Sequence, residues 1–347
     1  MHYQQKNSES LDEVRLFNSY WHLIGHKSEL SEPGDFIKFD TPSGDVVVFN
    51  DMGSLLAFDN RCAHRGASIY SGDHGNAQPI CKYHGWAYRN GKLIIPKKET
   101  FRNCDIDSAD INKFRLDLVG DFVFIGINPI HSLREQIGSI ADLLEKISAS
   151  IKGRSDFNRY RFECFWPLAL ENALEPYHIP KVHPKTLASL KLGNGANMID
   201  GFNSIWYAPI NDEKIRKQLS TFRRFFNLDY QYEGYMSIYL FPFSMLSSTF
   251  GYSYSLQNFI PPKGTKDFTY FTSRLYSSNT VSEKSSEIMA SFFESSAAVN
   301  RQVFEEDHQI CISMPYDSWC FEPLKYASDA EMKIEHFRSL LKKFHTE

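Results

Sequence analysis

Hydrophobic and polar residues alternate in short runs through the first third of the chain. Between positions 36 and 58 the runs FIKF, DVVVF and LLAF are separated by Pro-Ser-Gly-Asp and Asp-Met-Gly. This pattern predicts short strands joined by tight turns. Asn90-Gly91 is a β-hairpin signal, and further apolar runs continue to Pro129. The pattern therefore predicts a small all-β domain over residues 15–129, with residues 1–14 either packed on it or flexible.

Beyond Pro129 the periodicity changes. Apolar positions between 131 and 151 follow helical spacing, and 157–166 reads as a strand followed by a helix near Pro167. Residues 200–276 are rich in Tyr, Phe and Ser with period-two stretches, which predicts an antiparallel sheet. A long helix is expected over 281–311, followed by a polar tail. We therefore predict an α+β fold with a second domain over 130–347, in which helices cover the antiparallel sheet.

Composition narrows the class of protein. A chain of 347 residues with 42% hydrophobic and 23% charged residues suits two globular domains. A net charge of −4 without charge blocks gives no reason to expect nucleic acid or an anionic membrane as a partner. The polar first fourteen residues show no secretory signal, and no apolar run reaches membrane-span length. The default expectation is the reducing cytoplasm.

Two mixed pairs of metal-binding residues, Cys62-Ala-His64 and Cys81-Lys-Tyr-His84, are separated by sixteen residues. Two thiolates on one iron and two imidazoles on the other make a Rieske [2Fe–2S] centre. A structural Cys2His2 zinc is the alternative, but zinc patterns usually pair Cys with Cys and His with His. The mixed pairs favour the cluster, and the contexts CAHRGA and CKYHGW resemble the Rieske domain of ring-hydroxylating oxygenases.

The remaining four cysteines show no disulfide-like spacing and are expected to be buried free thiols: Cys104, Cys164, Cys311 and Cys320.

His178 and His183 suggest a second metal site. On a regular α-helix their rings would lie roughly 140° apart, so they can share a metal only where the helix is distorted or ends. Pro180 and Pro184 supply that disruption, because each lacks an N–H and crowds the preceding turn. Two unrelated histidines on a regular helix remain the alternative. With one carboxylate, the two histidines would form the facial triad of non-haem Fe(II) enzymes.

Three consecutive acids, Glu305, Glu306 and Asp307, compete to supply that carboxylate. The helical neighbours of Asp307 three and four positions away are all apolar, those of Glu305 are all polar, and those of Glu306 are mixed. An acid within an apolar stripe must be neutralised or bound to a cation. Asp307 is therefore the predicted ligand, and Glu305 is predicted to face solvent.

Nearly the whole chain resembles the α-subunit of Rieske non-haem iron oxygenases. Asn172-Ala-Leu-Glu175-Pro-Tyr-His178, followed by His183, matches the motif N-x-x-(D/E)-x-x-H-x4-H between the cluster motif and a distal acidic helix. Many members have Asp in place of Glu175, and the Glu form resembles the branch with choline, glycine-betaine and carnitine monooxygenases. Lys82 replaces a frequent Pro, which affects loop rigidity but no ligand. The extra cysteines of respiratory-complex Rieske proteins are absent from the two motifs.

The resemblance implies a terminal oxygenase component, of monooxygenase type, that hydroxylates or demethylates a small organic substrate with O2. It also implies a homotrimer in which Glu175 bridges His84 of one subunit and His178 of the next, with Asn172 as a further catalytic candidate. The chain shows no flavin, nicotinamide or C-x4-C-x2-C ferredoxin pattern. Electrons are therefore expected from a separate NAD(P)H-dependent reductase, with or without a ferredoxin.

The substrate is the least determined feature of the sequence. A quaternary ammonium compound is favoured by the Glu-type motif and by aromatic residues that could form a cation–π cage. An aromatic ring is the alternative substrate. A Rieske electron carrier is a more distant alternative, because it would leave the second domain without a role. A zinc-stabilised binding protein is equally distant, and it would lack a visible chromophore.

Overall fold

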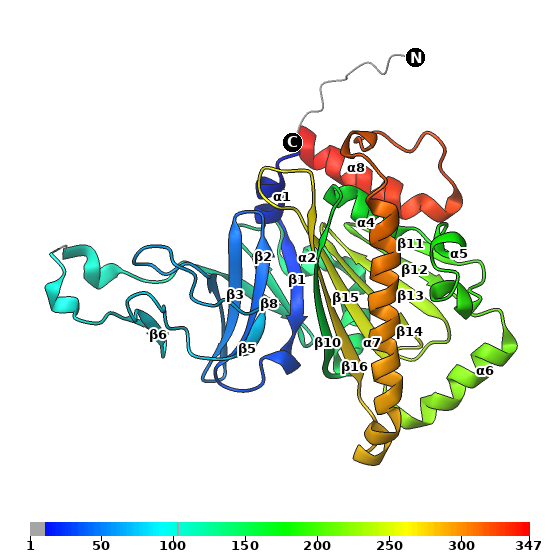
Figure 1. The fold of residues 1–347 in the computed structure, drawn as a ribbon, viewed down its shortest axis with the longest axis horizontal. Coiled ribbons are helices and arrows are strands. Elements are labelled where there is room, and N and C mark those ends of the chain that lie inside the picture. Colours follow the sequence, from blue (N-terminus) through cyan, green and yellow to red (C-terminus); the bar gives the residue numbers. More distant parts are fainter. Residues whose placement is uncertain (1–10, 103) are drawn as a thin grey trace.

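The computed structural model describes residues 11–102 and 104–347. Two seven-stranded antiparallel sheets and one two-stranded hairpin account for its strands, and helices are concentrated in the second half of the chain (Figure 1). The predicted α+β class is confirmed, with an all-β first part followed by an antiparallel sheet covered by helices.

The first sheet follows the alternating runs of the N-terminal third. Its strands lie in the order β1 (Trp21–His26), β9 (Phe122–Gly126), β8 (Lys113–Val119), β4 (Ser54–Asp59), β3 (Gly44–Asp51), β2 (Asp35–Thr41) and β5 (His74–Asn76). A hairpin of β6 (Ala87–Arg89) and β7 (Lys92–Ile94) extends from it. Asn90 and Gly91 turn this hairpin with φ of 51° and 76°, as the left-handed positions of a tight turn require. The Asn-Gly prediction is confirmed.

The second sheet has the order β10 (Ile151–Phe162), β16 (Thr269–Ser278), β15 (Ser253–Ile260), β14 (Ser244–Thr249), β13 (Tyr235–Leu240), β12 (Asn203–Ala208) and β11 (Ala196–Asp200). One face packs against α4 (Trp166–Leu174), α7 (Glu283–Cys311) and α8 (Met332–Thr346). The opposite face packs against α2 (Leu133–Ile137) and α3 (Ala141–Ala149) together with β1 and β9. Helices α1 (Glu13–Ser19), α5 (Ile179–Val182) and α6 (Glu213–Phe222) complete the chain.

Buried polar contacts join the two sheets. The amide of Gln136 bonds to both backbone groups of Trp21 and to the Phe241 carbonyl, at 2.8 to 3.0 Å. Arg154 on β10 donates to Glu29 at 2.6 Å, and a second ion pair links Arg159 to Asp40. Because these contacts replace water at buried charges and amides, they hold the two parts of the chain in one arrangement.

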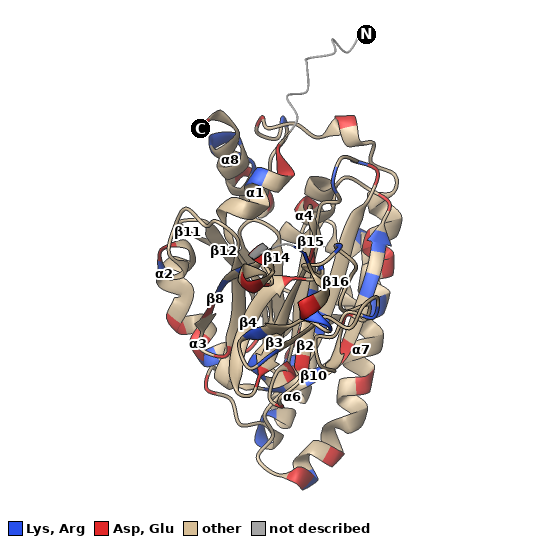
Figure 2. Ribbon diagram, turned by 90° about the vertical axis from the view of Figure 1, so that its left-hand side faces the viewer, with Lys and Arg blue, Asp and Glu red and all other residues tan. Residues whose placement is uncertain are grey.

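The C-terminal segment differs from its prediction as a polar tail. Residues 332–346 form α8, and its apolar side chains, spaced by three and four residues, are buried in the core: Ile334, Phe337, Leu341 and Phe344. This is the period of an amphipathic helix, which is easily overlooked in the sequence because five of the fifteen residues are charged. Figure 2 shows charges of both signs interspersed along the helices and loops.

The cysteines outside the two Cys/His motifs differ in their exposure. Cys164 and Cys311 are buried free thiols as expected, whereas Cys320 is exposed because it lies in the loop before α8. The side chain of Cys104 lies outside the described residues.

Within residues 11–102 and 104–347, no helix combines the length and apolar character needed to cross a bilayer.

Candidate metal centres

The first candidate centre is built from two loops with the same backbone pattern. In each loop the cysteine amide, of Cys62 or Cys81, donates to the carbonyl five residues later at 2.8 to 2.9 Å. The glycine four residues after each cysteine donates back to the cysteine carbonyl at the same distances. These glycines, Gly66 and Gly85, have φ of 73° and 74°, a left-handed conformation that costs glycine little. The repeat of one loop explains why two separate motifs present matching ligands.

The loops bring the four predicted ligands together. The Nδ1 atoms of His64 and His84 lie 3.1 Å apart, and the thiols of Cys62 and Cys81 are within hydrogen-bond reach of each other. Both cysteines are buried, and burial raises the pKa of the Cys62 thiol. Two neighbouring thiols and two neighbouring ring nitrogens are the donor set of a Rieske cluster, so the residues fit the group.

The two imidazoles lie at the protein surface. The His64 ring stacks on Trp86 with centroids 4.8 Å apart, and the His84 ring stacks on Tyr83 at 3.8 Å. His84 and Tyr83 are exposed. The edge of this centre is therefore accessible to another protein.

The second candidate centre begins where α4 ends. Leu174 is the last helical residue, Glu175 is extended with φ −114° and ψ 143°, and Pro176 follows. His178 and His183 flank the four-residue helix α5, whose second residue is Pro180. The proline-broken backbone brings the two rings together, and two unrelated histidines on a regular helix are not what the chain forms.

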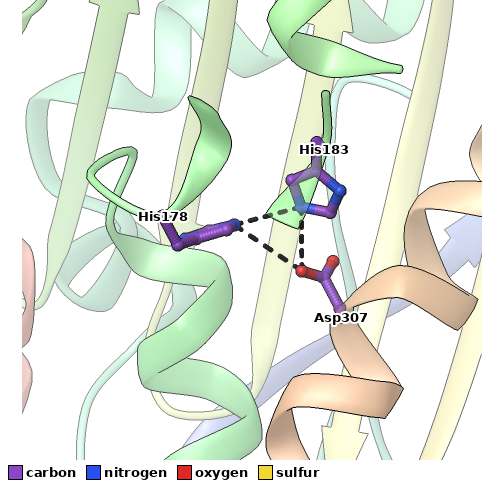
Figure 3. A group of neighbouring side chains, drawn as sticks. All are labelled: His178, His183 and Asp307. Atoms are coloured by element: carbon purple, nitrogen blue, oxygen red, sulfur yellow. Dashed lines mark hydrogen bonds and ion pairs between the residues drawn. The ribbon is translucent and has the colours of Figure 1, made fainter. Parts of the chain in front are cut away.

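Figure 3 shows the two rings and the Asp307 carboxylate, which belongs to α7, pointing toward one another. Nε2 of His183 lies 3.1 Å from Nε2 of His178 and 3.0 Å from Oδ1 of Asp307, and the third separation is 3.6 Å. Among the described residues, these three side chains are the one group of three or more His, Cys, Asp or Glu whose potential ligand atoms all lie within 4.8 Å of one another. Two imidazoles and one carboxylate on one side of such an ion fit a facial triad.

The geometry separates the three consecutive acids of α7. Asp307 follows the buried Phe304 by three residues and precedes the buried Cys311 by four, so it faces inward. Glu305 is exposed and, within residues 11–102 and 104–347, accepts one side-chain hydrogen bond, from Gln309 at 2.7 Å. Both assignments agree with the helical-neighbour prediction, although Ile310 is 40% exposed and therefore contributes little to the apolar surround.

Glu306 is a functional candidate that the sequence argument did not select. Its carboxylate accepts from Nδ1 of His183 at 2.8 Å and from the Thr186 hydroxyl at 2.7 Å, and Gln302 donates at 2.9 Å. Burial opposes the charge of Glu306, but these hydrogen bonds outweigh it and lower the pKa of the carboxyl. A carboxylate on the outer nitrogen of a metal-binding imidazole fixes its tautomer. The polar neighbour Gln302, four residues earlier on the helix, is the available sequence signal.

Two further predicted residues contact the triad. The Asn172 amide donates to Oδ1 of Asp307 at 2.7 Å. Glu175 accepts from Nδ1 of His178 at 2.7 Å and from the His178 backbone N–H at 3.1 Å, and it also accepts from the Tyr177 N–H. Each residue of the triad therefore has its own polar partner: Asn172 for Asp307, Glu175 for His178 and Glu306 for His183.

A hollow of about 810 Å³ lies beside the triad. Its walls come from the segment around α5 and from β11, β12 and the turn before α8, and include Tyr177, Ile179, Trp206 and Asp329. Ile179 directly follows the ligand His178. The hollow is thus lined by residues that neighbour His178 and His183 in sequence, but not by the triad itself.

One chain therefore carries a Rieske-type loop pair and a two-histidine, one-carboxylate triad. Its residues 20–103 match the family described as Rieske [2Fe-2S] domain. Residues 152–345, more than half of the chain, match the family described as ring hydroxylating alpha subunit (catalytic domain). The chain belongs to the ring-hydroxylating α-subunit family.

Curated relatives of the chain are oxygenase subunits. The carnitine monooxygenase oxygenase subunit of Escherichia coli is 29% identical over 197 residues, covering 52% of this chain and 50% of the relative. The glycine betaine monooxygenase oxygenase subunit of Chromohalobacter salexigens is 26% identical over 192 residues, covering 52% and 42%. The matched region thus spans about half the length of these relatives.

Solved structures extend the likeness in fold to the whole chain. The quaternary ammonium Rieske monooxygenase CntA superposes with a TM-score of 0.75 at 17% identity, covering 98% of this chain and 93% of that one. Naphthalene 1,2-dioxygenase superposes with a TM-score of 0.71 at 17% identity, covering 96% and 88%.

Proposed function

We propose that the protein is the terminal oxygenase component of a Rieske non-haem iron monooxygenase system. The observation that carries this proposal is the presence, in one chain, of the mixed Cys/His loop pair and of the triad His178, His183 and Asp307. A Rieske electron carrier would use only the first of these sites. A zinc-stabilised binding protein would use neither the triad nor its three hydrogen-bonding partners.

Cys62, His64, Cys81 and His84 would hold a [2Fe–2S] cluster, and the triad would hold a mononuclear Fe(II). When bound, the two groups supply single electrons and O2 activation. The chain's own residues orient the ligands: Glu175 and Glu306 hold the outer nitrogens of the two histidines, and Asn172 holds one oxygen of Asp307. These bonds fix both imidazole tautomers and leave both Nε2 atoms facing the metal position.

The cluster loops and the triad lie toward opposite ends of the molecule. In Figure 1, β6, which closely follows His84, is on the left of the view, and α5 is on the right. We propose that the active form is a homotrimer in which the His84 edge of one subunit meets the Glu175 side of the next. Glu175 would then accept from both imidazoles. Support comes from the exposure of His84 and Tyr83 at one end and of Tyr177, 72% exposed, at the other.

Electrons would come from a separate NAD(P)H-dependent reductase, directly or through a ferredoxin. We place the boundary between the Rieske domain (15–129) and the catalytic domain (130–347) near Pro129, where the first sheet ends. The reducing cytoplasm is the proposed compartment, in agreement with the buried thiols of Cys164 and Cys311, which form no disulfide.

For the substrate we propose a small quaternary ammonium compound that is hydroxylated or N-demethylated. It is supported by Glu175 in the bridge position and by relatives named for carnitine and glycine betaine. Trp206 and Tyr235, with ring centroids 5.9 Å apart beside the hollow, offer faces for cation–π contact. Hydroxylation of an aromatic ring is the second candidate, because a relative is named 2-halobenzoate 1,2-dioxygenase large subunit.

The test has two stages. The purified protein is first analysed for iron and acid-labile sulfide and for a rhombic EPR signal after reduction; stoichiometric zinc without sulfide would refute the proposal. Substrate-stimulated O2 uptake is then measured with a competent reductase on methylammonium compounds and on aromatic acids. Stimulation by aromatic acids alone would select the second candidate substrate.

A further inference from the structure

Lys333 on α8 is a buried amine that has no counter-ion among the described residues. Its side chain is fully buried, and its ammonium donates only to Ser237, to the hydroxyl at 3.1 Å and to the carbonyl at 3.5 Å. An ammonium has three donors, so one of them has no partner among the described residues. No described carboxylate forms an ion pair with it. Desolvating a charge without a partner costs several kcal/mol, so this arrangement requires an explanation.

Arg338, five residues further along the same helix, shows how this fold treats a structural cation. Arg338 is also buried, and its guanidinium donates to both oxygens of Glu171, at 2.7 Å each. Where a buried cation serves only to attach α8, the chain therefore supplies a carboxylate. The absence of a described carboxylate partner at Lys333 suggests that the anion arrives with a ligand.

The sheet face beside Lys333 carries buried serine side chains, whereas a surface that serves only for packing would be apolar. Ser237, Ser247 and Ser255 are cross-strand partners on β13, β14 and β15, all three buried. They lie on the sheet face that packs against α4, α7 and α8, since their neighbours Tyr239 and Met245 belong to that core. A buried row of hydroxyls can bind a polar molecule, whereas a core facing only helices would be apolar.

This row adjoins both the triad and the hollow. Tyr235, two residues before Ser237, bonds to the Ser247 side chain; burial raises its pKa, and the charge of Asp307 adds to the increase. Trp206, the cross-strand partner of Ser237, lines the hollow beside α5. Ser237 therefore lies next to a wall of the hollow and on the same strand face as a residue within electrostatic range of the triad.

We propose that Lys333 and Ser237 form an anion site that binds a carboxylate of the substrate and so directs the opposite end of the substrate toward His178, His183 and Asp307. The flexible stem of lysine lets the ammonium exchange its long contact with the Ser237 carbonyl for a ligand oxygen. The inference rests on the proposed function, and it narrows the substrate class to ammonium compounds that also carry a carboxylate.

The protonation behaviour of Lys333 agrees with this role. Burial lowers its pKa to about 7 in the ligand-free protein, because the charged form has lost water without gaining an anion. A carboxylate beside the amine would favour the charged form and raise that pKa again. Without ligand, a buried lysine can lose its proton and so avoid the desolvation cost that a permanently charged arginine would have at the same position.

The experiment measures equilibrium binding by calorimetry, with the full-length, metal-loaded protein. Glycine betaine and choline form a matched pair, since both carry a trimethylammonium group but only the first has a carboxylate. We expect Lys333→Met to weaken glycine betaine about 10- to 100-fold and to change choline less than about twofold. Ser237→Ala should act in the same direction with a smaller effect. Ser248→Ala is the control, because Ser248 is a buried serine on the opposite face of β14.

Other outcomes would overturn the proposal. Equal loss of both ligands in Lys333→Met, or no loss of glycine betaine, would mean that Lys333 only supports the fold. If Lys333→Met does not fold, Ser237→Ala decides on the same criterion. If the wild-type protein binds neither ammonium compound, the proposed substrate class fails, and benzoate becomes the probe. If Lys333→Met weakens benzoate binding, the anion site is supported. If benzoate binding is absent, or is unchanged in the variant, the anion site is refuted.

Discussion

The two candidate metal centres differ in how much of the chain builds them. All four cluster ligands lie within residues 62–86, on two loops whose backbone hydrogen bonds repeat. In the triad, His178 and His183 flank α5, whereas Asp307 lies on α7, more than 120 residues later in the sequence. His84 is exposed, whereas the His183 side chain is 0% exposed. A site that exchanges electrons with partners suits a surface loop, and a site that must exclude water suits an interior.

This difference predicts that the centres can be removed separately. Asp307→Ala should abolish oxygenation and lose the mononuclear iron, because two imidazoles alone bind Fe(II) weakly, while sulfide content and the cluster spectrum stay unchanged. Iron and sulfide analysis measures both. Glu305→Ala is the matched control, since Glu305 is an exposed acid two residues earlier on α7. If Asp307→Ala retains the iron and Glu306→Ala loses it, Glu306 and not Asp307 is the iron ligand.

Cys62→Ala tests the opposite separation. It should remove acid-labile sulfide and the visible spectrum, because one of the two thiolate ligands is gone, and leave the triad iron in place. Oxygenation with the reductase should fall to background. Loss of iron from both centres would show that the cluster loops are needed for the catalytic fold, contrary to the local construction of the loops. Circular dichroism of the variant provides the folding control.

Glu175→Gln tests the path between the centres. The variant keeps size and one acceptor but removes the charge that holds Nδ1 of His178. Both metal sites should fill, and the cluster should still accept an electron, but its reoxidation with substrate and O2 should slow by roughly 10- to 100-fold. Single-turnover mixing of the reduced protein measures this rate. A wild-type rate in the fully metallated variant would show that the bridge is not needed.

Glu306→Gln should have a smaller effect, confined to the interior centre. Removing the charge beside Nδ1 of His183 weakens the orientation of that ligand, while Thr186 and Gln302 still hold the side chain. We expect iron affinity to fall about 10-fold, with cluster reduction unchanged. Competition for iron with a chelator measures the affinity. An unchanged affinity would make Glu306 a structural acid only.

The smallest effect concerns stability rather than chemistry. His22 is buried, its Nε2–H donates to the Phe17 carbonyl at 2.7 Å, and burial lowers its pKa to about 4. Between pH 6.5 and 4 the unfolded chain binds a proton at this residue and the folded chain does not. Stability from His22 is therefore fully present above pH 6.5 and is lost as the pH falls toward 4, by roughly 3 kcal/mol.

His22→Gln keeps a donor for Phe17 but does not titrate, so it isolates that contribution. Urea unfolding of wild type and variant from pH 7 to pH 4 should give a difference that shrinks toward low pH. A constant difference across this range would contradict the buried neutral imidazole. Activity at pH 7 should remain close to wild type, because His22 on β1 is neither a predicted metal ligand nor a hydrogen-bonding partner of one.

Features that depend on neighbours along the chain could be predicted from the sequence. The cluster loops could be predicted because ligands, glycines and spacing lie within one short segment, and the Asn90-Gly91 turn follows from local backbone preferences. Helical periodicity selected Asp307 over Glu305, since a helix converts spacing into a face. Pro180 and Pro184 indicated the break that lets His178 and His183 meet.

Features that depend on contacts between distant elements could not be predicted from the sequence and follow from the packing of the folded chain. Glu306 contacts His183 because α7 passes α5, and no pattern within α7 specifies that crossing. The amphipathic helix α8 was hidden by its charged residues, and its burial of Lys333 against β13 depends on how the second sheet is ordered. Local propensities fix helices and turns through short-range geometry. The pairing of a buried side chain with its partner is fixed instead by packing between segments that are far apart in the chain.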